Sequence, residues 1–260
     1  MLRSIKSFEE YMVASSNGEV GSVTDFLFDD MEWAIRYLVV DTWKLFSGRK
    51  VLISPVAMQP EAGMPDSFSV AMTKEEISNS PSYRIDQPIS RAYEAELTNY
   101  YRWPAYWEGF KVGATGAVNV LPDVLPEGVE ALNPARKELS NLWNASEVIG
   151  YFIEATDGEI GYVEDFIVDD KSWTIRYMVI AIQSWLSDKK VLAFSRQPQK
   201  PGRKVLIVPQ WTRRISWGEA KVELSLSREA IENSPEFYPH APVNRLYETR
   251  FYDYYGKPAH

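Results

Sequence analysis

Carboxylate side chains are the one repeated group in this sequence whose type and spacing could do chemistry. They are Asp25, Asp29 and Asp30 in the first half of the chain, and Asp165, Asp169 and Asp170 in the second. Such a group could bind a cation or form an acidic docking patch. The spacing lacks the D-x-D-x-D-G pattern of a calcium loop, and aspartate is common in turns because it hydrogen-bonds to its own backbone. We therefore interpret these aspartates as turn residues.

Other reactive side chains are scarce. The chain contains two histidines, His240 and His260, and no cysteine. The lack of cysteine rules out thiolate nucleophiles, disulfides, Fe–S clusters and cysteine-ligated zinc. A Ser-His-Asp triad would have a single candidate base, no nucleophile-elbow sequence surrounds a serine, and no Gly-rich loop suits a phosphate. The sequence predicts no catalytic residue, no metal site and no cofactor.

Net charge and hydropathy narrow the range of partners. A net charge of −8 disfavours nucleic acid, whose phosphates are bound by clustered lysine and arginine. Residues 1–20 contain no apolar signal-peptide core, and no stretch approaches the roughly 20 apolar residues of a membrane-spanning helix. We expect a cytoplasmic protein without a transmembrane segment, in keeping with the absence of cysteine.

The sequence repeats itself. Residues 18–37 match residues 158–177 at an offset of 140 (158 − 18), so that Gly21, Asp25 and Trp33 correspond to Gly161, Asp165 and Trp173. Further on the offset is 154 (203 − 49), since 49–53 matches 203–207 and 79–81 matches 233–235. The second copy therefore carries 14 extra residues (154 − 140), which we place at 187–202. Such self-similarity is typical of a duplicated module.

Each copy is predicted to contain short strands followed by helices. Asn17-Gly18 and Asp157-Gly158 favour hairpin turns, and the runs that follow, 20–28 and 160–168, are rich in β-branched and aromatic residues. Further strands are expected at 34–41, 51–54 and 68–72, and at 174–182, 205–208 and 222–226. Five or six short antiparallel strands in about 75 residues favour a small closed barrel. Thr73 and Glu76 predict a capping box at the start of a helix, and Ser227 is the matching cap.

Three sets of repeated residues could pack within the protein or contact a partner. The first is a helical stripe at the end of each copy, formed by Tyr93, Leu97 and Tyr101 and by Tyr247, Phe251 and Tyr255. Spacings of three and four place each stripe on one helix face, which could cover its own barrel, the other copy or another chain. The second set is Arg36 and Arg176, which could pair with Asp25 and Asp165 or anchor a partner. The third is Trp33 and Trp173, which are expected to pack at the mouth of a barrel.

These motifs resemble the PRC-barrel family. The pattern is a Gly-x-x-x-Asp strand, a Trp-x-Ile-Arg-Tyr-x-Val-Val strand and Arg-Lys-Val-Leu-Ile-x-Pro, followed by Asn-Ser-Pro and Arg-x-Tyr-Glu as in bacterial stress-type members. The resemblance covers 5–102 and 147–256 and leaves a Pro/Gly/aromatic linker at 103–146. It implies a mainly β chain with two small PRC-like barrels, each with short flanking helices. Similar domains form the cytoplasmic part of the photosynthetic reaction-centre H subunit and half of a ribosome maturation factor, and both dock on protein partners.

The resemblance and the lack of reactive groups predict a non-catalytic adaptor or scaffold that contacts a protein partner. The partner could be a second copy of the chain or the cytoplasmic face of a larger complex. A scaffold needs no unique polar cluster, and we find none in the sequence. The alternative that stays open is a carboxylate-dependent hydrolase with its site between the two barrels.

Overall fold

The computed structural model describes residues 1–42, 49–59, 66–84, 89–108, 110–112, 118–120, 141–182, 202–241 and 243–256. The insertion predicted at 187–202 lies outside these residues except for Gly202, as do His260 and much of the linker predicted at 103–146. Over the described residues the chain is mainly β, as predicted. No described helix is long and apolar enough to cross a membrane.

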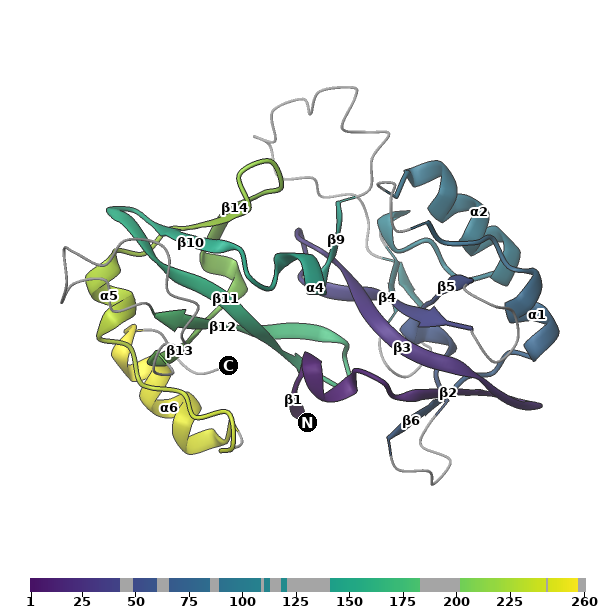
Figure 1. The fold of residues 1–260 in the computed structure, drawn as a ribbon, viewed down its shortest axis with the longest axis horizontal. Helices are drawn as coiled ribbons and strands as arrows, with labels where there is room; N and C mark the ends of the chain where they lie inside the picture. Colours follow the sequence, from purple (N-terminus) through teal and green to yellow (C-terminus); the bar gives the residue numbers. More distant parts are fainter. Residues whose placement is uncertain are drawn as a thin grey trace, which may run out of the picture. The chain divides into compact units, whose positions relative to one another are not determined.

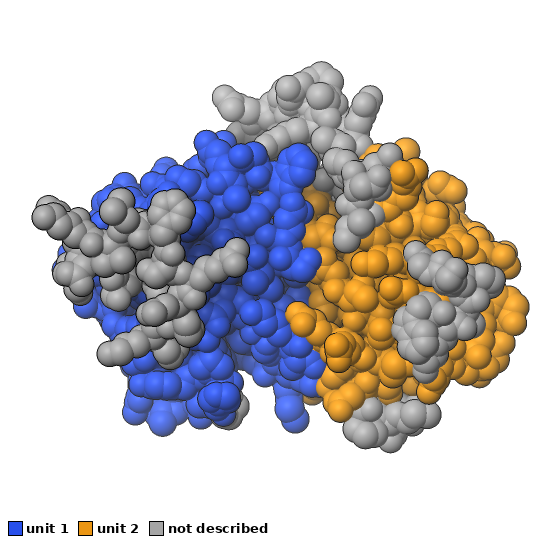
Figure 2. Space-filling model, viewed as in Figure 1, with its two compact units in different colours: residues 1–7, 145–170, 174–260 blue, residues 8–144, 171–173 orange. Residues whose placement is uncertain are grey.

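The chain forms two compact units (Figure 2). Unit 1 contains residues 1–7, 145–170 and 174–260, and unit 2 contains residues 8–144 and 171–173. These boundaries differ from the predicted 5–102 and 147–256, because each half of the sequence contributes a short segment to the unit formed mainly by the other half. Such exchanged segments have no local sequence signal, since their strand partners lie more than a hundred residues away.

The described part of unit 2 contains a mixed sheet together with the helices α1 (Lys74–Asn79) and α2 (Arg91–Tyr101) (Figure 1). Its strands are β2 (Met12–Ser15), β3 (Gly18–Asp29), β4 (Ala34–Asp41), β5 (Lys50–Ile53), β6 (Ser67–Ser69) and β9 (Leu142–Asn144). The strand order in this sheet is β6-β2-β3-β4-β5, and β9 also pairs with β3. Among these strands β2 and β6 form the parallel pair. The helices are accompanied by the 3-10 turns η2 (Pro55–Ala57) and η3 (Tyr106–Glu108). A hairpin of β7 (Phe110–Val112) and β8 (Val118–Val120) follows.

Unit 1 repeats this arrangement with different chain segments (Figure 1). Its strands are β1 (Leu2–Ser4), β10 (Phe152–Ala155), β11 (Gly158–Asp169), β12 (Thr174–Ile182), β13 (Lys204–Ile207), β14 (Thr212–Ser216) and β15 (Lys221–Leu224). The order is β14-β15-β10-β11-β12-β13, with β1 also on β11. Its helices are α4 (Ala145–Val148), α5 (Arg228–Glu232) and α6 (Arg245–Tyr254), and η4 (Pro209–Trp211) precedes β14. The 3-10 helix η1 (Ile5–Phe8) follows β1.

Closed barrels are not observed. Among the described residues no ladder joins β13 to β14, so the sheet of unit 1 remains open along that line. The reason lies in the chain path: β13 runs through η4 directly into β14, and a tight corner of this kind turns the chain without pairing the strands on either side of it. In unit 2 the chain likewise runs from β5 through η2 to an isolated bridge between Met58 and Val70.

The first strand of each half pairs with the long strand of the other half. By the offset of 140, β1 corresponds to β9. Yet β1 pairs with β11 inside unit 1, through Leu2↔Asp169 and Ser4↔Ile167. Conversely, β9 pairs with β3 inside unit 2, through Leu27↔Asn144 and Asp29↔Leu142. Each unit therefore needs a strand from the other half of the sequence.

Two glycines at matched positions allow close backbone approach. A Cβ atom on Gly21 would lie 1.8 Å from the carbonyl oxygen of Asp41, and one on Gly161 would lie 2.1 Å from that of Ala181. Both contacts are far shorter than van der Waals contact, and both involve backbone atoms of the neighbouring strand. The repeat of glycine at these positions is thus explained by packing.

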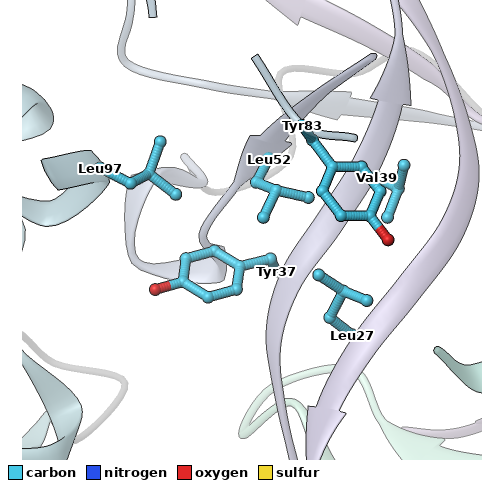
Figure 3. Close-up of a cluster of buried hydrophobic side chains, with 6 residues drawn as sticks. All are labelled: Leu27, Tyr37, Val39, Leu52, Tyr83 and Leu97. Atoms are coloured by element: carbon cyan, nitrogen blue, oxygen red, sulfur yellow. The ribbon is translucent and has the colours of Figure 1, made fainter. Parts of the chain in front are cut away.

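The helical stripe of unit 2 covers its own sheet. Leu97 on α2 packs with Tyr37, Val39 and Leu52 of the sheet in a buried cluster (Figure 3), and Tyr93 and Tyr101 lie against it. The predicted capping box of α1 is confirmed, because Thr73 accepts a hydrogen bond from the Glu76 N–H and the Glu76 carboxylate accepts one from the Thr73 N–H.

The stripe of unit 1 behaves in the same way. Phe251 is fully buried, with ring centroids 5.5 Å from Tyr177 and 5.8 Å from Trp211. Tyr255 packs on Trp211 at 4.3 Å, and the Tyr247 hydroxyl donates to the Pro235 carbonyl at 3.1 Å. In both units these side chains pack within their own unit, with Leu97 and Phe251 buried and the tyrosines partly exposed; a further contact of the stripes with a partner stays a prediction.

Candidate functional site: a pocket in unit 1

A pocket of about 310 Å³ opens in unit 1. It is lined by β1, by the middle of β11 and β12, by the start of β13 and by the segment 237–243. Five polar residues line it: Ser4, Lys6, Glu164, Asp165 and Lys204. The volume lies near the lower end of the range for small-ligand sites, which suits a single side chain.

Asp165 is the half-buried carboxylate of this pocket. Its Oδ1 accepts a hydrogen bond from the Phe166 N–H at 2.8 Å, and its Oδ2 accepts one from the Ser4 hydroxyl. Burial raises the pKa of the Asp165 carboxyl, while the hydrogen bonds and the charge of Lys6 act in the opposite direction. Asp165 is thus an oriented hydrogen-bond acceptor.

The other charges of the pocket are balanced. Lys204 and Glu164 form an ion pair across β13 and β11. Lys6 lines the same pocket as Asp165, and its charge acts to lower the pKa of that carboxyl. Two cations and two carboxylates therefore line the pocket, and their formal charges cancel. The remaining walls are apolar and include Ile167, Val179, Phe237 and Val243.

The matched positions in unit 2 are filled. Asp25 is only 7% exposed, and its Oδ2 accepts a hydrogen bond from the Asn144 amide at 2.8 Å. The Tyr83 hydroxyl lies 3.3 Å from the same amide nitrogen. The ring of Tyr83 packs beside Leu27 and Val39 in the buried cluster (Figure 3). A chain of phenol, amide and carboxylate thus closes this part of unit 2.

Three side chains that line the pocket of unit 1 are smaller than their counterparts in unit 2. Ser4 stands where unit 2 has Asn144, which shortens the side chain by an amide group. Phe237 stands where unit 2 has Tyr83, which removes the hydroxyl. The third change is from Ile89 to Val243, which removes a methylene group. The two halves of the chain have therefore diverged at the residues that decide whether this space is occupied.

Large exposed apolar side chains occur in both units, and two of those in unit 1 are close in sequence to residues that line the pocket. Tyr238 is 60% exposed and Leu246 is 62% exposed, and they lie within three residues of Phe237 and Val243 at the pocket. The matched residues of unit 2 are Arg84 and Ala92. Elsewhere in unit 1, Phe152 and Trp217 are exposed as well. Exposed apolar side chains of this size are typical of contact surfaces.

Arg36 does not pair with Asp25, so that prediction is wrong. Its guanidinium pairs with Asp29 and lies 3.1 Å from Glu32. The reason is a bulge: Phe28 pairs with Ile35 and Leu27 with Tyr37, which leaves Arg36 as the extra residue beside Asp29. Arg176 occupies the matching bulge in unit 1, where the position of Glu32 is taken by a serine.

Asp29 fits the turn interpretation of the aspartates, which is wrong for Asp25 and Asp165 because they lie within β3 and β11 and pair with Val39 and Val179. The Oδ1 of Asp29 accepts hydrogen bonds from the N–H groups of Met31 at 3.0 Å and Glu32 at 2.8 Å. Asp30 accepts one from the Trp143 indole at 2.9 Å. These carboxylates therefore hold the hairpin loop between β3 and β4. Among the described residues no group of three His, Cys, Asp or Glu side chains is placed to hold a metal ion.

The two repeated tryptophans pack inside unit 2. Trp33 is 5% exposed and stacks on Phe28, with ring centroids 5.3 Å apart. Trp173, which comes from the second half of the sequence, packs against Phe8 at 5.8 Å and Phe68 at 5.5 Å. Both tryptophans adopt a positive φ of 54° in their hairpin loops, a conformation that most residues avoid. We see no functional group that either indole serves.

Glu94 is a buried carboxylate that sequence reasoning missed. It has no exposed surface, and it lies 2.7 Å from an Arg91 guanidinium nitrogen and 2.8 Å from the Tyr106 hydroxyl. Tyr37 donates to it at 3.3 Å, and Arg36 stacks over the ring of Tyr106 at 4.1 Å. The repeated Arg-x-Tyr-Glu motif contained this glutamate and was the available signal. Because Glu94 has no exposed surface, the network offers no site that a ligand could reach.

Glu94 leads to a prediction about pH. Burial raises the pKa of the Glu94 carboxyl above its ordinary 4.5, although Arg91 opposes this. The folded state therefore binds the Glu94 proton more tightly than the unfolded state does. The stability that this proton contributes is fully present below about pH 4.5, and it is lost as the pH rises through the pKa of Glu94 in the folded state. We expect the stability of Glu94→Gln relative to the unsubstituted protein to increase from pH 4.5 to pH 7. Urea unfolding at several pH values measures this, and a decrease would mean that Arg91 outweighs burial.

No family model matches the chain, and no curated protein does.

Proposed function

We propose that this protein is a non-catalytic adaptor of the cytoplasm that binds a protein partner through unit 1. The observation that carries the proposal is the pocket around Asp165, which is open in unit 1 and filled at the matched positions of unit 2. Exposed Tyr238 and Leu246 follow the lining residues Phe237 and Val243 in the sequence and could extend the contact surface. Aromatic side chains around a small pocket are typical of the centre of a protein interface.

The architecture that we propose is a tandem duplication of a PRC-like barrel. The matched lengths of β3 and β11, and the bulges at Val23/Asp25 and Val163/Asp165, support this. The exchanged strands β1 and β9 suggest that the duplicated halves descend from a dimer of single modules. In the PRC-barrel examples the barrel docks on a larger protein assembly, and we propose the same kind of role here.

The pocket favours binding over hydrolysis. A carboxylate-dependent hydrolase needs a second catalytic group beside the carboxylate to activate water. Where that group is another carboxylate, the two carboxylates act as a pair. In this pocket Glu164 is ion-paired with Lys204, and both oxygens of Asp165 already accept hydrogen bonds. The pocket therefore presents Asp165 as a fixed hydrogen-bond acceptor among charges that cancel, which suits the binding of a ligand.

Site-specific photocrosslinking tests the proposal. Benzoylphenylalanine is placed at position 238 instead of Tyr238 and, as a matched control in unit 2, at position 84 instead of Arg84. Both positions are exposed, so the probe fits at either. After irradiation in an extract of the native host, we expect a discrete adduct from position 238 and none of the same mass from position 84. Equal adducts, or none from position 238, would contradict docking through unit 1.

A further inference from the structure

We propose that the pocket of unit 1 receives a tyrosine side chain of the protein partner, with the ring against the apolar walls and the hydroxyl donating to Asp165. This inference rests on the proposed docking function and names the chemistry of the contact. It follows from three features of the pocket: its charge balance, its acceptor and the residues that fill the same space in unit 2.

The charge balance favours a neutral group. Lys6 and Lys204 disfavour a cation, while Glu164 and Asp165 disfavour an anion. An ionised ligand would meet like charges in a confined space, and this repulsion is costly where water is scarce. A neutral ring with one polar atom avoids both penalties and leaves the pair of Lys204 and Glu164 intact.

Asp165 can accept a further hydrogen bond from a donor at the tip of the ligand. Asp165 is held by the Phe166 N–H and the Ser4 hydroxyl, and it lines the pocket as a half-buried carboxylate. Each carboxylate oxygen can accept a second hydrogen bond. A phenol presents such a donor at the end of a flat apolar body, whereas a phenylalanine ring would leave the buried acceptor without an added partner.

Unit 2 provides an internal example of the same chemistry. There the Tyr83 ring packs on Leu27 and Val39 (Figure 3). Its hydroxyl reaches the Asp25 carboxylate through the amide of Asn144. In unit 1 the ring at the matched position is Phe237, which has no hydroxyl, and Ser4 has no amide to bridge the distance. A tyrosine from outside, with its ring beside Phe237, would bring a hydroxyl directly to the Asp165 carboxylate.

Methyl NMR of the full chain tests this inference with three ligands. They are N-acetyl-tyrosinamide, its O-methyl ether and N-acetyl-phenylalaninamide, which differ only at the para position of the ring. We expect the tyrosine compound to shift the methyl signals of Ile167, Val179 and Val243, and the other two to bind about tenfold more weakly, because they lack the donor to a charged acceptor. The methyls of Val39, which matches Val179, should not shift.

A pocket-closing variant provides the control. The double substitution Ser4→Asn with Phe237→Tyr installs the side chains that fill unit 2, and we expect it to abolish the shifts at Val179 and Val243. Equal affinity for the three ligands, no shift at these methyls, or unchanged binding to the variant would each overturn the inference. An adduct from position 238 without tyrosine binding would refute this inference alone and leave docking through unit 1 in place.

Discussion

Replacing Gly161 by alanine is expected to lower the free energy of unfolding by about 3 kcal/mol. The new Cβ would lie 2.1 Å from the carbonyl oxygen of Ala181, so the backbones of two adjacent strands would have to move apart. The strands concerned, β11 and β12, are central to unit 1. Denaturant unfolding followed by tryptophan fluorescence measures the change.

The matched control for this substitution is Gly218→Ala. A Cβ at Gly218 would meet no atom within 4 Å, so its effect should stay within about 0.5 kcal/mol. If Gly161→Ala were as mild as Gly218→Ala, the close approach of the strands would be wrong. The same pair of measurements can be repeated with Gly21→Ala, for which the contact is 1.8 Å.

Removing the ring of Phe251 is expected to cost about 3–5 kcal/mol of stability. Phe251 is fully buried among Tyr177, Trp211 and Tyr255, so alanine at this position would leave a cavity. The control on the same helix is Leu246→Ala, which removes a side chain that is 62% exposed and should change stability by less than about 0.5 kcal/mol.

Phe251→Ala also decides between the two roles that the sequence left open for the aromatic stripes. If the stripe serves its own unit, the substitution lowers the unfolding free energy and leaves the sedimentation coefficient of the folded protein unchanged. Unchanged stability together with a loss of self-association would instead make the stripe an interface between copies of the chain.

Local features of the fold could be predicted from sequence because they depend on neighbouring residues. The run 20–28 falls within β3, and the strand predicted at 34–41 is β4. The cap at Ser227 also forms, since its side chain accepts from the Ala230 N–H. Turn and cap chemistry of this kind is set within three or four residues, which is the range that sequence patterns cover.

Long-range features could not be predicted in this way. The pairing of β1 with β11 joins segments more than 150 residues apart, and neither strand carries a sign of its partner. The bulge that turns Arg36 toward Asp29 breaks the strict alternation on which the predicted pair with Asp25 depended. Closure of the sheet also failed as a prediction, because strand number alone does not determine whether the edge strands meet.

The candidate site depends on side-chain volume at positions that the repeat aligns. Tyr83 against Phe237 and Asn144 against Ser4 were visible in the sequence as mismatches between the halves. Without the fold, however, nothing indicates that these four residues surround the two matched aspartates. Attention to where the copies differ, in addition to where they agree, would have pointed to this space.

The most direct test of docking through the pocket combines the crosslink with the pocket-closing variant. Benzoylphenylalanine at position 238 is compared in the unsubstituted background and with Ser4→Asn and Phe237→Tyr, using the same host extract. Circular dichroism and unfolding confirm that both proteins fold equally well. We predict that closing the pocket lowers the adduct yield about tenfold, as expected when the central anchor of an interface is lost. An undiminished adduct would show that the partner does not enter the pocket.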